Sequence, residues 1–114
     1  MPQVNATTVL AELQRHIGAD NGIHVRELVY RITNAVMRDE ALERKVREIV
    51  TELRMQGQHV CGHPASGYYI AATAQELEAT CEFLYQRAMT GLSQVARMKH
   101  VSLPDLRGQL HLPT

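Results

Sequence analysis

Aromatic residues are scarce in this sequence, which has no tryptophan, one phenylalanine and four tyrosines. A folded core built from it must therefore be mostly aliphatic. Cysteine is also scarce, and the two thiols, Cys61 and Cys81, do not make a disulfide framework. Together with the lack of a signal peptide, this usage favours a cytoplasmic protein in a reducing compartment.

Long hydrophobic runs and a surplus of either charge are missing as well. No apolar run approaches the roughly 18 residues of a membrane span, so no membrane partner is expected. With 12 basic and 12 acidic residues the net charge is zero, which argues against a general nucleic-acid coat. The charges are nevertheless segregated, because the stretch from Arg54 to Ala72 contains one arginine, two histidines and no acid. A surface with one basic face remains compatible with this pattern.

The length of 114 residues fits one domain, which can bury a core without disulfides or metals. Its most regular stretch begins at Asp39, which can cap a helix that ends at Gly57. Apolar residues recur along this helix at helical spacing and form one stripe: Leu42, Val46, Ile49, Val50 and Leu53.

Residues 58–71 predict a short β-hairpin. Residues 58–61 alternate polar and apolar like a strand, and residues 68–71 can form the return strand after a turn at residues 62–67, which has two glycines and a proline. In this hairpin Val60 is expected on one face, with His59 and Cys61 on the other.

Two shorter helices are expected before the central one. The first begins at a cap within residues 5–8 and ends near Gly18. The second runs over about residues 25–33, after a short edge-strand segment at residues 23–24. Residues 34–38 connect it to the central helix, either by lengthening a helix or by looping out.

A long C-terminal helix is expected from Thr73, because Thr73 and Glu76 have the spacing of a capping box. It carries a heptad seam: Leu77, Cys81, Leu84, Ala88, Gly91, Val95 and Met98. The seam can pack on the first helix or pair with a second subunit. Because a helix of about 27 residues is about 40 Å long, which exceeds the body it would cover, a homodimer is favoured. Antiparallel pairing would set its acidic start beside the basic end of its mate.

Two motifs in this order resemble the biotin-repressor-like type of winged helix-turn-helix domain. One is the helix end LRMQG at residues 53–57, and the other is the strand GYYI at residues 67–70. The continuation GYYIAAT, placed before a long helix, is most similar to small winged-helix proteins encoded by phages and prophages. The resemblance covers roughly residues 8–75.

This resemblance implies a mainly α (α+β) fold, a winged helix-turn-helix with a two-stranded wing and a long C-terminal helix. The winged domain would span residues 1–73, a dimerisation helix residues 74–101 and a flexible tail residues 102–114. The implied function is sequence- or structure-specific binding of double-stranded DNA, in phage or prophage transcription regulation or DNA replication. Residues 39–56 would form the recognition helix and residues 58–71 the wing.

An α-helix fits the major groove of DNA, where Arg and Lys donate to guanine acceptors. Direct contacts are expected from Arg44, Lys45 and Arg47, with Glu48 and Thr51 as base readers and Arg54 on a phosphate. The wing would touch the backbone of the minor groove through His59, His63 and Ser66.

A second interpretation treats the helix charges as a solvated face, held by intrahelical pairs such as Glu43–Arg47. The winged domain would then bind a host, phage or replication protein without touching DNA. Zero net charge and the acids within the central helix favour this alternative.

His59, Cys61 and His63 alternate along the hairpin and could begin a zinc site, with Cys81 or His100 as a further ligand. No fourth ligand has a convincing spacing, and a strand with incidental polar residues is the simpler explanation. A catalytic pair of His59 and Cys61 would lack an orienting group and an oxyanion site. No metal, cofactor or enzymatic activity is therefore expected.

Overall fold

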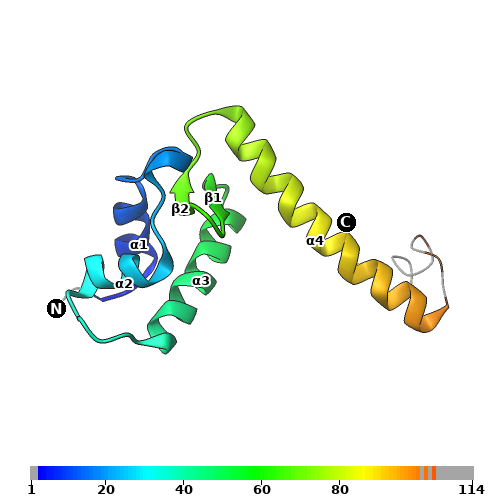
Figure 1. The fold of residues 1–114 in the computed structure, drawn as a ribbon, viewed down its shortest axis with the longest axis horizontal. Coiled ribbons are helices and arrows are strands. Elements are labelled where there is room, and N and C mark those ends of the chain that lie inside the picture. Colours follow the sequence, from blue (N-terminus) through cyan, green and yellow to red (C-terminus); the bar gives the residue numbers. More distant parts are fainter. Residues whose placement is uncertain (1–2, 101, 103, 105–114) are drawn as a thin grey trace. The chain divides into compact units, whose positions relative to one another are not determined.

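The computed structural model describes residues 3–100, Ser102 and Pro104. It is mainly helical, with one two-stranded antiparallel sheet and a long C-terminal helix (Figure 1), which confirms the predicted mainly α (α+β) class. The chain divides into two compact units, Met1–Thr80 and Cys81–Thr114.

The first unit is built on three helices that pack against one another, α1 (Ala6–Leu13), α2 (Val25–Thr33) and α3 (Glu40–Met55) (Figure 1). Most of the apolar stripe of each helix is buried, as the helical spacing predicts, and Leu10, Val25 and Leu42 are partly buried. Together with Ile23 and Val60 these side chains form one aliphatic core: Val9, Leu13, Leu28, Val29, Ile32, Val46, Ile49, Val50 and Leu53.

Helix α1 begins at a capping box, in which the Thr8 amide donates to Asn5 Oδ1 and the Asn5 amide donates to Thr8 Oγ1. It ends at Leu13, so the predicted end near Gly18 is wrong. The cause is pairing with the sheet, because the Ile70 amide donates to the His16 carbonyl and the Gly18 amide donates to the Ile70 carbonyl, both at 2.8 Å. Those pairs hold the chain extended after α1.

The connection between α2 and α3 is a loop. Asn34 closes α2 in the left-handed conformation with a φ of 60°. Asp39 then caps α3, accepting from the Leu42 amide at 3.1 Å. Of the two predicted forms for residues 34–38, the structure therefore has the loop.

The sheet is a hairpin of β1 (Val60–His63) and β2 (Gly67–Ile70), with Val60 opposite Ile70. The other edge of β2 pairs with Ile23, which exchanges two 2.8 Å backbone hydrogen bonds with Tyr68. The expected edge-strand segment is thus present as a single bridge.

Gly67 permits this close approach. Its φ is +77°, and a Cβ atom there would lie 2.5 Å from the carbonyl carbon and oxygen of Ile23.

Helix α4 (Ala74–Lys99) begins within the first unit. The Glu76 amide donates to Thr73 Oγ1 at 3.1 Å, as a capping box requires. The Glu76 carboxylate instead accepts two other hydrogen bonds. The Ala19 amide, in the 3-10 turn η1 (Ala19–Asn21), donates at 2.8 Å, and the Ala72 amide donates at 2.7 Å. Hydrogen bonds from these N–H groups stabilise the carboxylate and hold the pKa of Glu76 below its ordinary value, with the Ala19 amide contributing most.

The second unit begins at Cys81, and its helical part runs to Lys99. The expected tail, residues 102–114, lies outside the described residues apart from Ser102 and Pro104. Within the described part of the chain, no helix is long and apolar enough to cross a membrane.

Candidate nucleic-acid interface

Helix α3 has one buried and one exposed face. The helical spacing places Arg44, Glu48 and Thr51 at the centre of the exposed face, with Lys45 and Arg47 at its two borders. All five side chains that the sequence assigned to a groove are exposed to solvent. The side of α3 that packs on α1 and α2 is formed by Val46, Ile49, Val50 and Leu53, so the helix presents its polar side outward.

The cations on this face differ in their partners. Among residues 3–100, no carboxylate forms an ion pair with Arg44 or Lys45. Arg47 reaches Glu43 at 4.0 Å, which confirms the expected pair but leaves it long. Two cations of the exposed face are therefore available to an anionic ligand.

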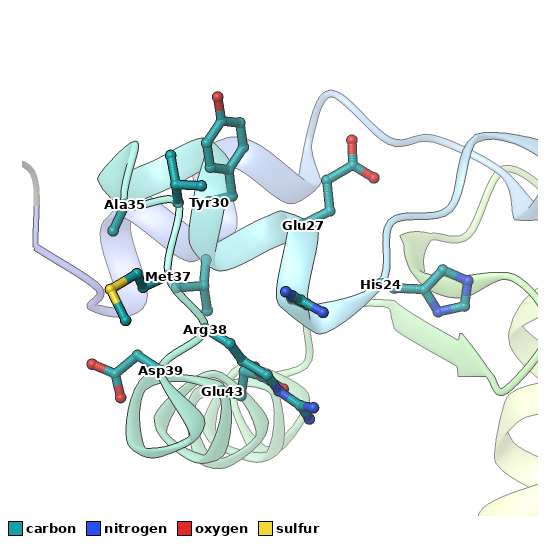
Figure 2. Close-up of a pocket in the computed structure, with 11 residues that line it drawn as sticks. His24, Glu27, Tyr30, Ala35, Met37, Arg38, Asp39 and Glu43 are labelled. Atoms are coloured by element: carbon teal, nitrogen blue, oxygen red, sulfur yellow. The ribbon is translucent and has the colours of Figure 1, made fainter.

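Glu43 is buried and has a stronger partner that the sequence did not reveal. Arg38 donates from Nε and Nη2 to the two carboxylate oxygens at 2.9 and 3.3 Å (Figure 2). These contacts raise the pKa of Arg38. The pair fastens the loop before α3 to the first turn of that helix, so Arg38 is occupied by a structural contact.

Arg54 joins α3 to the hairpin. Its Nε donates to the Val60 carbonyl at 2.7 Å, and its Nη2 would lie 3.3 Å from a Cβ atom placed on Gly62. This contact gives Arg54 a structural role that the sequence did not predict.

The hairpin tip carries no acidic side chain. His63 and its neighbours Pro64 and Ala65 are exposed, and Ser66 is half-buried. The Ala65 amide donates to His63 Nδ1 at 3.1 Å, so in the neutral ring the proton lies on Nε2, which can donate to a ligand. His59 is exposed just before β1.

Strand β1 has a buried side chain on each of its two faces. Both Val60 and Cys61 are buried, while His59 and His63 are exposed. The Cys61 thiol donates to the Glu76 carbonyl at 3.6 Å, because the start of α4 covers the second face of the strand. The pKa of Tyr69 is raised, mainly because burial disfavours its charged form and next because Cys61 is adjacent.

His59, Cys61 and His63 consequently do not converge on one point. Across residues 3–100, Ser102 and Pro104, no three side chains of His, Cys, Asp or Glu come together as a metal site.

A hollow of about 360 Å³ lies beside α3, between α2 and the loop at residues 34–39 (Figure 2). Its rim is apolar on the loop side, where Val36 and Met37 are 83% and 85% exposed, and Tyr30 of α2 is also exposed. Sequence reasoning missed this surface, because the loop was treated only as a connection.

Two surfaces of the first unit thus have the chemistry of a binding site. One is the exposed face of α3 with the hairpin after it, and the other is the apolar rim of the hollow. Comparison with known protein families, curated proteins and solved structures finds no match to this chain. A function is therefore inferred from these surfaces.

Proposed function

We propose that the first unit is a winged helix-turn-helix domain that binds double-stranded DNA. In this proposal α2 and α3 form the helix-turn-helix, α3 is the recognition helix and the β1–β2 hairpin is the wing. The observation that carries it is the pair of exposed cations on α3, Arg44 and Lys45, which no carboxylate neutralises in the described chain. An α-helix with its opposite face packed on a core is the element that enters a major groove.

The centre of the exposed face supplies both kinds of contact. Arg44 can donate to the acceptors of guanine, while Lys45 and Arg47, at the borders, are placed for phosphates on either side of a groove. Glu48 can accept from a cytosine amino group, and Thr51 has lone pairs left after its hydroxyl donates to the Arg47 carbonyl at 3.2 Å.

The first turn of α3 limits how the helix can approach DNA. Asp39 caps it and Glu40 is exposed there, so this end repels phosphate. The contact must therefore use the middle of the helix, with the acid-free hairpin reaching an adjacent backbone through His59, His63 and Ser66. Arg54 is assigned mainly to holding the hairpin on α3.

The proposal is tested by fluorescence anisotropy with mixed duplexes at low salt. The protein in which Arg44, Lys45 and Arg47 are all changed to Ala should bind at least tenfold more weakly than the parent. Arg15→Ala with Arg97→Ala removes exposed cations elsewhere and should leave affinity nearly unchanged. Equal affinity of the triple variant and the parent, or no binding by either, would overturn it.

The apolar rim of the hollow supports a second candidate, a winged helix that binds a host, phage or replication protein. Two hydrophobic side chains that are more than four-fifths exposed on one short loop, Val36 and Met37, are unusual for a purely structural connection. A partner held there should be recovered in stoichiometric amount from nuclease-treated lysate by the parent. It should be lost from Met37→Glu and kept by the triple alanine variant.

From the sequence resemblance to phage and prophage proteins, we infer that either activity serves regulation of transcription or DNA replication. We also propose that the functional unit is a cytoplasmic homodimer joined through α4. A two-fold dimer would present two recognition helices to a palindromic site.

A further inference from the structure

The heptad seam of α4 is exposed from Cys81 to Met98, and Leu77 before it is half-buried. Leu84 and Val95 are 39% and 37% exposed, and Met98 is 81% exposed. Cys81, Ala88 and Gly91 are exposed as well. A Cβ atom placed on Gly91 would meet nothing within 4 Å. An apolar helical stripe of this kind is stabilised when another helix covers it.

We propose that the seam is covered by a second copy of this chain, running antiparallel in one defined register. From Cys81 to Met98 the seam reads the same from both ends, because its spacings are symmetric about the midpoint between Ala88 and Gly91. Antiparallel pairing about that midpoint sets an a position of one helix against a d position of the other. The three layers, each formed twice, are Cys81 with Met98, Leu84 with Val95, and Ala88 with Gly91.

Residue sizes fit this register. The small residues Ala88 and Gly91 meet at the two-fold axis and let the helices approach closely, while larger side chains close the interface on either side. Beside the seam, at the e positions, Tyr85 of one copy lies opposite Leu92 of the other. The largest seam side chains are thus paired with smaller or flexible ones.

Charge selects the antiparallel direction. In the same register the outer e positions bring Glu78 of one copy opposite Lys99 of the other, twice in the dimer. In a parallel pair the acidic starts of the two helices, each with Glu76, Glu78 and Glu82, would lie side by side. The two basic ends would also lie side by side. It would also align the two helix dipoles. Opposite charges and opposed dipoles both favour the antiparallel arrangement.

The native cysteine separates the two directions. In the antiparallel register the two Cys81 residues are about 26 Å apart along the axis, since a helix rises about 1.5 Å per residue. That distance is far beyond the roughly 6 Å between Cα atoms that a disulfide spans. In a parallel pair the two Cys81 side chains would instead be adjacent. Cys61, the only other cysteine, is buried.

The experiment combines sedimentation with cysteine oxidation by copper phenanthroline. The parent should sediment as a dimer at micromolar concentration and should not form a covalent dimer. Met98→Cys should cross-link efficiently, because Cys81 faces residue 98 of the second copy. The variant with Met98→Cys and Cys81→Ser should not. A covalent dimer of the parent would overturn the antiparallel direction, and failure of Met98→Cys to cross-link would overturn the register.

Substitutions test the seam and the charge pair separately. Leu84→Glu should give a monomer by sedimentation, whereas Thr90→Glu, outside the seam on the same helix, should leave a dimer. Lys99→Glu should weaken the dimer about tenfold, since it places a second negative charge opposite Glu78 at both ends of the interface. Adding Glu78→Lys should restore the dimer. Circular dichroism checks that each variant keeps its helix.

A parent that sediments as a monomer, unchanged by Leu84→Glu, would show that the seam is used within one chain, and would overturn the dimer. A dimer in which double charge reversal fails to restore affinity would overturn the register. None of these measurements involves DNA. The dimer can therefore fail while the proposed DNA binding holds, and the reverse is also true.

Discussion

The guanidinium of Arg54 donates a 2.7 Å hydrogen bond from Nε to the main-chain carbonyl of Val60, so α3 and the hairpin are fastened to each other. A hydrogen bond to a charged group contributes about 1.5–3 kcal/mol to stability. Arg54→Ala should therefore lower the free energy of unfolding by about that amount. The measurement is a urea titration followed by circular dichroism.

Arg44→Ala is the matched control for Arg54, because it removes the same side chain from the exposed face of the same helix. A surface change of this kind should stay within about 0.5 kcal/mol. Equal unfolding midpoints for the Arg54 and Arg44 variants would contradict the structural role assigned to Arg54.

The pairing of Arg38 with the buried carboxylate of Glu43 predicts a coupled loss of stability. Among the residues that the structure describes, Arg38→Ala leaves Glu43 with only the 4.0 Å contact to Arg47, and it should destabilise the protein more than Arg44→Ala does. In a Glu43→Met background the same Arg38→Ala change should have little effect, since no buried charge remains. A double-mutant cycle of urea midpoints measures this coupling, and additive effects would refute it.

Glu76 predicts a pH dependence of stability. The amides of Ala19 and Ala72 hold the pKa of Glu76 below its ordinary value of 4.5. The folded state therefore releases this proton more readily than the unfolded state. Its stabilising effect is complete above about pH 4.5 and is lost as the pH falls through the lowered value.

Glu76→Gln should lower stability at neutral pH and make the acid side of the stability profile shallower. Thermal unfolding between pH 3 and 7, buffered at about 0.1 M ionic strength, measures the profile. Glu82→Gln, at an exposed position of the same helix outside the seam, is the control. An acid limb with the parent's slope in Glu76→Gln would contradict the assignment.

Two glycines with positive φ predict unequal costs for alanine. At Gly57, with a φ of +88°, a Cβ atom would meet nothing within 4 Å, so Gly57→Ala should cost only about 1 kcal/mol. At Gly67 the Cβ atom would lie 2.5 Å from the Ile23 carbonyl. Gly67→Ala should therefore cost at least about twice as much, since the backbone must also shift. Unfolding midpoints compare the two, and equal costs would show that β2 does not approach Ile23 closely.

The helices of this protein could be read from its sequence because local signals and burial agree. Asp39 caps α3 as expected, and the stripe that includes Val46 and Leu53 is buried. The hairpin was found in the same way, from a turn rich in glycine flanked by short strands. Such features depend on residues close together in the chain.

Contacts between distant residues could not be predicted in this way. Alternation in β1 assigned Val60 and Cys61 to opposite faces, but it could not show that the start of α4 covers the second face and buries Cys61. The end of α1 at Leu13 depends on pairing with Ile70, which is far along the chain. Charge patterning likewise could not separate arginines with structural contacts from other arginines. Arg38 and Arg54 have such contacts, whereas Arg44 has no ion pair among the described residues.

The most direct test of the proposed function is the salt dependence of duplex binding. Each phosphate neutralised by a cation contributes about 0.9 to the slope of log affinity against log salt concentration. For parent and variants the slope is measured by anisotropy between about 0.05 and 0.2 M salt. Arg15→Ala with Arg97→Ala serves as the charge-matched control for Arg44→Ala with Lys45→Ala.

If the exposed face of α3 meets DNA, removing Arg44 and Lys45 should weaken binding and reduce the slope by up to about 0.9 for each cation that touches a phosphate. The control should keep the slope and affinity of the parent. A slope that does not change for Arg44→Ala with Lys45→Ala, or that falls equally in the control, would contradict DNA binding by this face.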